Sequence, residues 1–548
     1  MADPTEPDLI VRGGAVLTLD AAGRRVSALA AREGRITALG DDREISALAG
    51  PTTRILELEG RTAIPGFVES HNHPAFFGFA LAAPVDAGSP PNDRIPDIVG
   101  RLASAVRDAP AGEWVRGFRY DHTLLAERRH PTRHDLDPVS PRHPVVLTHV
   151  TGHFCTVNSA ALALVGITAA SPDPPGGRIE RDASGEPTGV LAETAAFLVN
   201  SQLPAPDEEV VEQSLRLADQ EFLTHGITTV HDTGTGMFGS AVELGLYRRL
   251  TASGALRTRV RSYIGQQAFA REDGSMPTPA ELASPGDGER FRIVGVKIIA
   301  DGSLQGRTGC LAEGYHQHPD EHGLMLQSPA KLAEMITSVD AAGWQAAVHG
   351  NGDAAIEAIV RAYRDVDSAA KRHRIEHCQT VREDQLDRMA EQGVLASFFV
   401  KHVYYWGDGH RDLWLGPERA RRISPLVSAH RRGIVYGLHS DTPVTPVPPL
   451  EGVWCAVARR TRDGHELGPE QAVDVERALR AYTVDAAYLA GEERETGTLE
   501  VGKLADLAVL SDDPTAVTTE ALRTLRVETT VVGGEVVWSA TGAPGPAR

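Results

Sequence analysis

Two histidines one residue apart, His71 and His73, follow the apolar run that begins IPGFVES. On a β-strand alternate side chains share a face, so both imidazoles would point the same way, with Asn72 opposite. Neutral imidazole is a common metal ligand, and this spacing would let a strand end grip one ion. A pair of ordinary surface or core histidines is the alternative, and further ligands are needed to decide between the two.

Further candidate ligands stand at the ends of later strand-like runs. The runs VGVKIIADGS, QAAVHGNGD, RIEHCQ and YGLHSDTP supply Lys297, His349, His377 and Asp441. Taken singly, each histidine could be a structural hydrogen bonder, and Asp441 could cap a helix. Lys297 differs, because an unpaired ammonium in an apolar strand is costly. It needs a partner, such as Asp301 or Glu376, or a modification: the neutral amine can combine with carbon dioxide to give an anionic carbamate able to bridge two divalent cations.

The elements that must position these residues alternate between strand-like and helix-like runs from about residue 66 to residue 490. The strand candidates after the first are PVVLTHV, GITTVHDTG, RIVGVKIIADGS, WQAAVHGNG, HRIEHCQ, GVLASFFV and GIVYGLHSD. Helix candidates include EEVVEQSLRLADQEFLTHG and SPAKLAEMITSVDAAG, each ending at a glycine suited to a left-handed cap. About eight such units favour a (β/α)8 TIM-type barrel, in which polar residues at the strand ends converge on one site.

Both ends of the chain have a different texture, with short β-like runs separated by glycine turns. We therefore predict one small, discontinuous β-sandwich domain from residues 1–64 and 492–548, with a hairpin at Gly533 and Gly534. The barrel would occupy residues 65–491. Within it, the stretch around 83–204 is too long for a loop and is predicted to be an insertion over the barrel mouth.

Composition narrows the class of protein. The 548 residues are 41% hydrophobic and 24% charged. The sequence contains no run of about 18 apolar residues, so we expect no membrane span. The acidic, proline-bearing start lacks the pattern of a secretory signal, so we expect a cytoplasmic protein that begins close to Met1. Four scattered cysteines argue against disulfides and a cysteine-based zinc site. A net charge of -19 disfavours nucleic acid as a partner.

As an ordered set, PGFVESHNH, ADGSLQGRTG, HGNGDAAIEA, RIEHCQ, HSDTPV and GTLEVGKLADLAVL resemble motifs of the metal-dependent amidohydrolase superfamily. The similarity is greatest to its YtcJ-like branch, which includes N-substituted formamide deformylases, and it covers nearly the whole chain. The insertion motifs GHFCTVNSAAL and PPGGRIERDASGEPTGVLAE are also similar. Two departures concern the surroundings of the ligands: Glu69 stands where many relatives have Asp, and HGNGD replaces a more usual small apolar residue after His349.

The resemblance implies two divalent metal ions, with zinc expected because nitrogen and carboxylate ligands suit it. It implies His71 and His73 on the more buried metal, a carboxylated Lys297 as the bridge, and His349 and His377 on the second metal. Asp441 would be both a metal ligand and the general base.

The implied reaction is hydrolysis of a C–N bond in an amide, formamide or related small molecule, through a metal-bridged hydroxide. The alternatives are a mononuclear deaminase or an esterase on the same scaffold, or a catalytically silent, metal-binding regulatory barrel. We expect a small-molecule substrate and no nucleic acid or membrane partner, with a homodimer as one option.

Substrate contacts are less strongly indicated. The segment FFVKHVYYWGDGH could line the barrel mouth through His402, Tyr404 and Trp406, with simple packing as the alternative. His153 in GHFCTVNSAAL could reach down from the insertion to bind substrate or stabilise an oxyanion. Arg307 in GSLQGRTG could anchor a loop or an anionic group.

Overall fold

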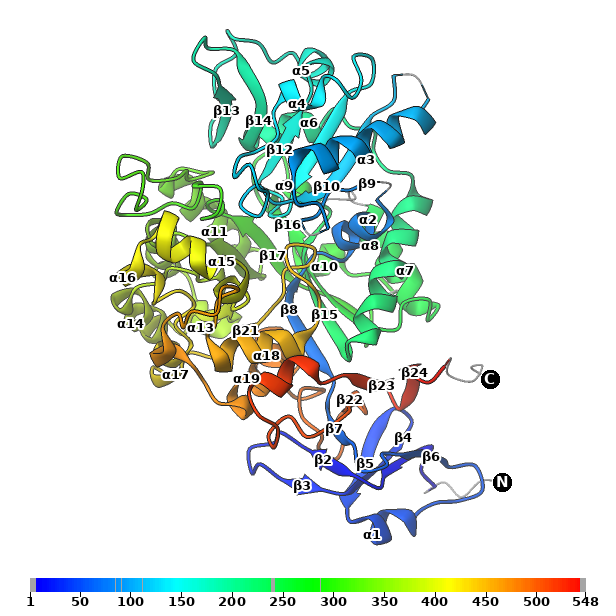
Figure 1. Ribbon diagram of the computed structural model, residues 1–548. Coiled ribbons are helices and arrows are strands. Elements are labelled where there is room, and N and C mark those ends of the chain that lie inside the picture. The colour runs from blue at the N-terminus through cyan, green and yellow to red at the C-terminus, as the bar shows by residue number, and fades with distance from the viewer. Residues whose placement is uncertain are drawn as a thin grey trace.

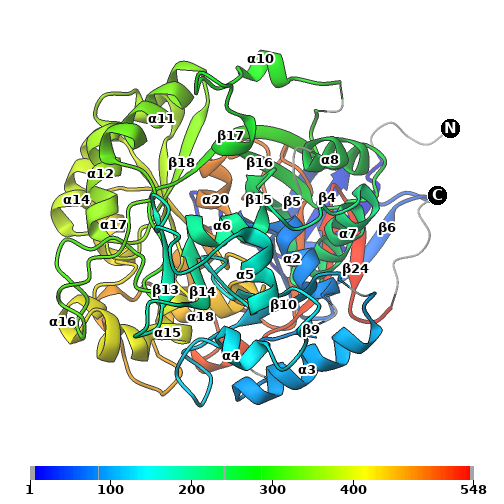
Figure 2. The same cartoon turned by 90° about the horizontal axis from the view of Figure 1, so that it is seen from above.

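The structure is a computed structural model that describes residues 6–83, 85–89, 91–110, 112–237, 242–285 and 287–542. Its centre is an eight-stranded sheet in which every paired neighbour is parallel. In spatial order the strands are β8 (Phe67–Asn72), β15 (Ile227–Thr235), β16 (Arg259–Gly265), β17 (Phe291–Ile299), β18 (Gln345–Gly350), β19 (Arg374–His377), β20 (Leu395–Phe398) and β21 (Tyr436–Leu438). Figure 2 shows helices arranged around these strands. The fold is therefore a nearly closed TIM-like barrel, as predicted.

Side chains join the first and last strands, β8 and β21, which share no backbone ladder among the described residues. Ser70 Oγ donates to the carbonyl of Leu438 at 3.0 Å. Just beyond β21, the amide of Ser440 donates to Glu69 Oε2 at 3.0 Å. Glu69, the residue that departs from the family pattern, is thus a buried contact across the barrel seam.

The outer helices follow the periodicity of their apolar residues. In α7 (Glu208–Thr224) the buried residues include Val211, Leu215, Ala218 and Phe222, spaced three or four apart along one face. The helix ends just before Gly226, whose φ of +73° is the left-handed conformation that glycine adopts easily. Further helices on the outside are α8 (Val242–Ala252), α11 (Pro329–Ala341), α12 (Asp353–Tyr363), α14 (Glu383–Gln392), α17 (Leu426–Arg431) and α20 (Val484–Leu489).

One strand assignment made from the sequence is wrong. PVVLTHV forms β11 (Val145–His149) in another sheet, whereas the barrel strand β16 has the sequence RVRSYIG. Two arginines interrupt the apolar pattern of β16, yet both are fully buried. Arg259 pairs with Asp506 at 2.6 Å and Arg261 pairs with Glu492 at 2.7 Å. The acidic partners come from the C-terminal part of the chain, so a local pattern could not reveal them.

The insertion carries its own six-stranded sheet. Its strands in order are β13 (Gly177–Arg181), β14 (Pro187–Glu193), β12 (Phe154–Val157), β11, β10 (Val115–Tyr120) and β9 (Val85–Asp86). The helices with it include α3 (Ile95–Asp108), α4 (Arg133–Leu136), α5 (Ser159–Val165) and α6 (Thr194–Asn200). Asn158 caps α5, its side chain accepting from the Ala161 amide. Figure 1 places these elements together above the barrel.

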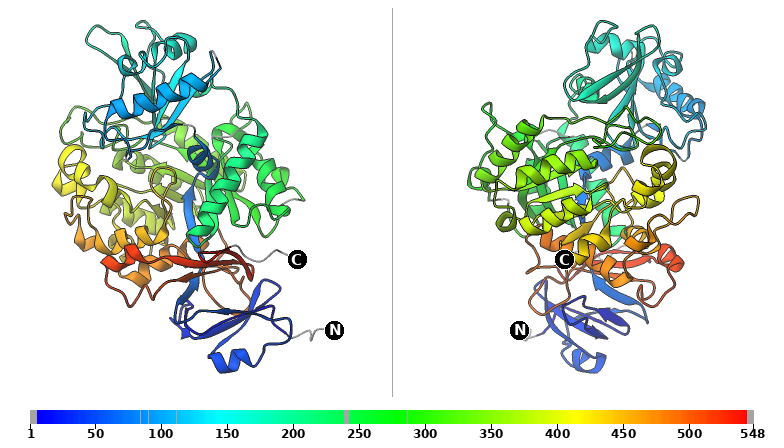
Figure 3. Two further views of the ribbon diagram at one scale, coloured as in Figure 1. Left: turned by 45° about the vertical axis from the view of Figure 1, so that its right-hand side comes forward. Right: turned by 90° about the vertical axis from the view of Figure 1, so that its left-hand side faces the viewer.

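Both chain ends contribute to two further sheets. One is β5 (Arg35–Gly40), β4 (Ala28–Arg32), β1 (Leu9–Arg12) and β6 (Arg54–Glu57); the other is β24 (Glu535–Ser539), β23 (Val527–Val532), β22 (Leu507–Leu510), β7 (Thr62–Pro65), β2 (Ala15–Leu17) and β3 (Arg25–Val26). Antiparallel pairing of β7 with β22 brings the two ends together. Figure 3 shows these sheets and the insertion at opposite ends of the barrel.

Several smaller predictions can be compared with the structure. Gly533 and Gly534 form the turn between β23 and β24 with φ values of +57° and +73°, which confirms the hairpin. All four cysteines are free thiols. Among the described residues, no helix has the length and apolar character needed to cross a bilayer. The sandwich and the domain boundaries remain predictions.

Candidate metal centre

The six predicted ligands come from the carboxyl ends of the barrel strands. His71 lies in β8, Lys297 in β17, His349 in β18 and His377 at the end of β19, while His73 caps helix α2 (Pro74–Ala82) and Asp441 follows β21. Their side chains are buried or nearly so. Because parallel strands of a barrel end on one face, these residues meet although more than 300 positions separate the first from the last.

Short distances join His71, His73 and Asp441. His73 Nε2 lies 3.2 Å from Asp441 Oδ1, and His71 Nε2 lies 3.4 Å from the same oxygen. One ligand atom from each of the three residues falls within 4.8 Å of the other two. The ring of His377 is 4.7 Å from that of His71 and 4.6 Å from that of His349, centroid to centroid. The structure thus brings all three strand-end histidines and the aspartate into one cluster.

Glu376 determines how His71 faces this cluster. Its Oε2 lies 2.6 Å from His71 Nδ1, and its other oxygen accepts from Arg374 Nε. A carboxylate can only accept, so Nδ1 carries the proton and the Nε2 lone pair points toward Asp441. Burial, with help from nearby Lys297, holds the pKa of His71 well below its usual value, so the imidazole is neutral. This is the state in which histidine binds a metal.

The residues fit a cation. Asp441 Oδ1 is buried and accepts no hydrogen bond from the described residues. It lies 3.4 Å from Nε2 of His71, and a bound cation would stabilise this contact between two electron-rich atoms. Asp441 also has a φ of +53°, a strained conformation for a residue with a side chain.

Lys297 is buried beside this group, its Nζ 3.3 Å from His71 Nε2. Burial lowers its pKa to about 8, although Glu376 and Asp441 oppose the shift. Among the described residues Lys297 has no ion pair within 4 Å, so the alternative of a pairing with Asp301 or Glu376 is not formed. Asp301 instead accepts from the amides of Cys310, Asn351 and Gly352.

His349 and His377 have neighbours that sequence reasoning did not single out. His349 Nε2 lies 3.2 Å from the Gly302 carbonyl and 3.1 Å from the side-chain amide of Asn351, which stands in the HGNGD motif. His377 Nδ1 lies 3.1 Å from Nε2 of His439. His439 stands in the same YGLHSDTP motif as Asp441, so its proximity to the site could have been inferred from that motif.

His153 reaches the site from the insertion. Its ring is 5.3 Å from that of His349, and its Nδ1 is 2.9 Å from Glu193 Oε2. Burial alone would lower the pKa of His153, but the Glu193 carboxylate outweighs it and the net shift is upward. Glu193 itself has φ 54° and ψ −122°, an unusual backbone conformation for a residue other than glycine. His153 therefore lies beside the central histidines, and its contact with substrate remains a prediction.

The other four predicted substrate contacts are placed differently. Tyr404 of α15 (His402–Gly409) contacts Trp454 and the guanidinium of Arg523, which belong to the outer helices, and this favours a packing role. Packing of this kind is the alternative that the sequence offered to a position at the barrel mouth. Trp406 Nε1 donates to Asp121 of the insertion at 2.9 Å.

His402 and Arg307 also have structural neighbours. The ring of His402 is buried 4.1 Å from that of Phe399. Arg307 pairs with Glu321 at 2.9 Å and contacts His318 at 3.0 Å. These contacts favour the role of a loop anchor, one of the two that the sequence allowed, over the binding of an anionic group.

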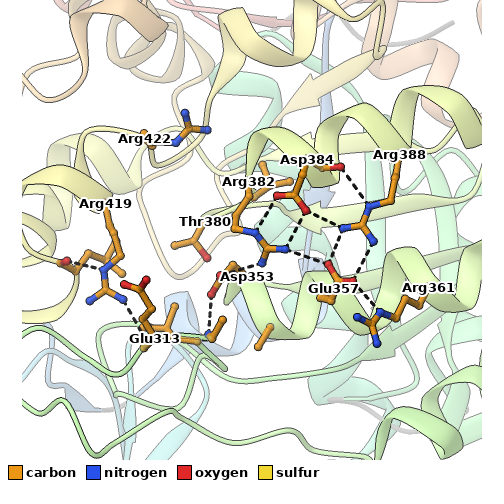
Figure 4. Close-up of a pocket in the computed structure, with 15 residues that line it drawn as sticks. Glu313, Asp353, Glu357, Arg361, Thr380, Arg382, Asp384, Arg388, Arg419 and Arg422 are labelled. Atoms are coloured by element: carbon orange, nitrogen blue, oxygen red, sulfur yellow. Dashed lines mark hydrogen bonds and ion pairs between the residues drawn. The ribbon is translucent and has the colours of Figure 1, made fainter.

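A cavity of about 840 Å³ lies away from the histidines, beside α12, α14 and α16 (Pro417–Ala420). Figure 4 shows that charged side chains line it and pair with one another. Glu357 accepts from Arg361 at 2.7 Å, from Arg388 at 2.6 Å and from Arg382 at 3.1 Å. The carboxylate of Glu357 is neutralised by these arginines, and none of the predicted ligands lines the cavity, so it does not indicate a catalytic site.

Comparisons with known proteins agree with this geometry. Residues 54–538 match the family model described as "Amidohydrolase family". The chain is 32% identical to N-substituted formamide deformylase of Arthrobacter pascens over 98% of this chain and 99% of that protein. It is 29% identical to the YtcJ protein of Bacillus subtilis (strain 168), over 96% of this chain and 99% of that protein. A crystal structure of an uncharacterized metal-dependent hydrolase from Pyrococcus horikoshii OT3 superposes with a TM-score of 0.73 at 23% identity, covering 93% and 99%, which shows a shared fold. The chain belongs to the amidohydrolase family.

Proposed function

We propose that this protein hydrolyses a C–N bond of a small amide-like molecule at a centre of two divalent metal ions. The observation that carries the proposal is the unprotonated contact between Asp441 Oδ1 and His71 Nε2 within a buried histidine cluster. An N-substituted formamide is the first substrate to test, because a deformylase for such compounds is similar along its whole length.

The proposed ligand set follows the resemblance: His71 and His73 for one ion, His349 and His377 for the other, Asp441 as a further ligand, and a carbamate on Lys297 as the bridge. Burial lowers the pKa of Lys297 to about 8, which makes the neutral amine, the form that combines with carbon dioxide, more accessible near neutral pH. Zinc is the proposed metal because it accepts imidazole and carboxylate ligands. Bound there, the ions would acidify a water molecule and polarise the substrate carbonyl.

The residues of the chain then handle protons and position the substrate. Asp441 would accept a proton from the attacking water and later return it to the leaving nitrogen. Glu193 holds His153 Nδ1, which leaves Nε2 of that ring to donate to the substrate close to His349. The insertion would thereby supply one wall of the substrate site above the barrel mouth.

The test compares Asp441→Asn, His153→Ala and the matched surface control Glu321→Gln on N-formyl, N-acyl and ester substrates, with metal content measured for each protein. Loss of a positioned general base costs about 10²- to 10⁴-fold. We expect that loss in kcat for Asp441→Asn with at least one metal retained. His153→Ala should lose mainly kcat/KM.

Two outcomes would contradict the proposal: full turnover by metal-free wild-type protein, or near wild-type turnover by Asp441→Asn with both metals bound. Activity on esters alone would move the reaction class to an esterase. A single bound ion with deaminase activity would favour the mononuclear alternative.

We also propose that the two terminal sheets form a small β-sandwich. One cluster of buried apolar side chains supports this, since it includes Leu9 and Leu29 from one sheet and Val16, Leu507 and Val531 from the other. Two sheets that share a hydrophobic core in this way are the basic arrangement of a sandwich.

A further inference from the structure

A second group of metal-ligand side chains lies in the insertion. Asp121 and His122 follow β10, and His149 ends β11, the neighbouring strand. Nδ1 of His122 is 3.1 Å from Nε2 of His149. The same Nε2 of His149 is 3.9 Å from Asp121 Oδ1. One ligand atom from each residue falls within 4.8 Å of the others. For comparison, ligands about 2.05 Å from a tetrahedral zinc lie about 3.3 Å apart.

The surroundings orient these ligands. Asp121 Oδ1 accepts from the amide of Thr123 at 2.9 Å and from its hydroxyl at 2.6 Å. Asp121 Oδ2 accepts from Trp406 Nε1 at 2.9 Å. Metal-binding carboxylates are commonly fixed by such hydrogen bonds, and Oδ2, which accepts only one of them, keeps a lone pair for the ion.

Both imidazoles are suited to coordination. Burial lowers the pKa of His122 to about 4 and that of His149 well below its usual value, so both rings are neutral at pH 7. His149 is buried, whereas His122 is partly exposed and gives an ion a route of entry. The hydroxyl of Thr151 lies 2.9 Å from His149 Nδ1 and can accept its proton when Nε2 binds a metal.

The same residues also have a metal-free hydrogen-bonding pattern. The amide of Thr151 lies 3.2 Å from His149 Nδ1 and, when it donates there, leaves the proton on Nε2. His149 Nε2 would then donate to His122 Nδ1 across the 3.1 Å contact. Metal binding at Nε2 must therefore move the His149 proton to Nδ1, and the Thr151 amide then loses its acceptor. The metal-bound and metal-free states can be distinguished directly by measuring metal content.

We propose that Asp121, His122 and His149 bind a divalent transition-metal ion, separate from the central site, that fastens the insertion to the barrel mouth. The connection to the barrel runs through Trp406 of α15, which is bonded to Asp121. Two imidazoles and a carboxylate favour zinc, with water or another group completing four-coordination. Such an ion would hold the wall that carries His153 above the central histidines.

The test measures zinc per chain after equilibration with buffered zinc and removal of excess, for wild type, His122→Gln, His149→Gln and the control His130→Gln. His130 stacks on His122 with ring centroids 3.8 Å apart but is not part of the three-residue group. We expect both group variants to bind one zinc fewer than wild type and the control. Zinc content equal to wild type in a folded His122→Gln protein would overturn the proposal.

The test is independent of the proposed reaction. The same comparison is repeated with Asp441→Asn and His73→Ala already present, which disables the central site. If His122→Gln still lowers the zinc content in this background, the insertion binds its own ion even if the central site holds none. If the difference disappears there, the loss belongs to the central site and the proposal fails. Should His149→Gln not fold, the partly exposed His122 still provides the measurement.

Discussion

Glu376→Gln should weaken metal binding although Glu376 is not a ligand. Its carboxylate lies 2.6 Å from His71 Nδ1, fixing the ring so that Nε2 faces Asp441. Glutamine retains the size and one hydrogen-bond acceptor. It loses the negative charge that makes the imidazole more basic and therefore a better metal ligand. Removing such a partner costs about 10- to 100-fold in metal affinity, or about 1.4–2.8 kcal/mol. We therefore expect the dissociation constant of the first zinc ion to rise by this factor.

The same change leaves Arg374 buried without its carboxylate, which lowers stability as well. Two measurements separate the effects: zinc affinity by chelator competition, and the free energy of unfolding of the metal-free protein. Glu321→Gln serves as the surface control, since its partner Arg307 is partly exposed. Zinc affinity within about twofold of wild type in a folded Glu376→Gln protein would refute the role assigned to Glu376.

Three further changes test other parts of the structure. Lys297→Arg should lose the second metal and most activity, because guanidinium stays protonated and forms no carbamate; full metal content in the elemental analysis would contradict this. Hydrogen bonds led by Arg388 hold the pKa of Glu357 well below its ordinary 4.5, so its stabilisation exists above about pH 4.5 and is lost as pH falls toward the folded-state pKa. Glu357→Gln should therefore unfold about 1–2 kcal/mol more easily in urea at pH 7 and show a flatter dependence below pH 5; an unchanged acid dependence would contradict the assignment. Glu492→Ala strands the buried Arg261 and should cost about 3–5 kcal/mol in urea unfolding, whereas a loss below about 1 kcal/mol would show that the pair contributes little.

The ligands could be predicted because barrel geometry follows a simple rule. Polar residues at the ends of apolar strands are conspicuous, and parallel strands carry their ends to one face. The same rule failed for β16, because Arg259 and Arg261 interrupt its apolar run and their acidic partners, Asp506 and Glu492, lie far along the chain. The same rule also assigned PVVLTHV to the barrel by mistake. An apolar strand of the insertion sheet has the same local pattern as a strand of the barrel.

The residues that orient the ligands were harder to predict, and β19 shows why. Regular alternation would send Glu376 and His377 to opposite faces of the strand. In the structure His377 has a φ of +67° and Cys378 a φ of +46°, so the backbone turns as the strand ends. Glu376 keeps the inward direction and meets His71, while His377 turns to meet His349. A positive φ is uncommon at residues other than glycine and costs about 1–3 kcal/mol, so no propensity argument would place it there. Strain at a strand end can thus deliver two adjacent side chains to one site, which a period of two in the sequence would exclude.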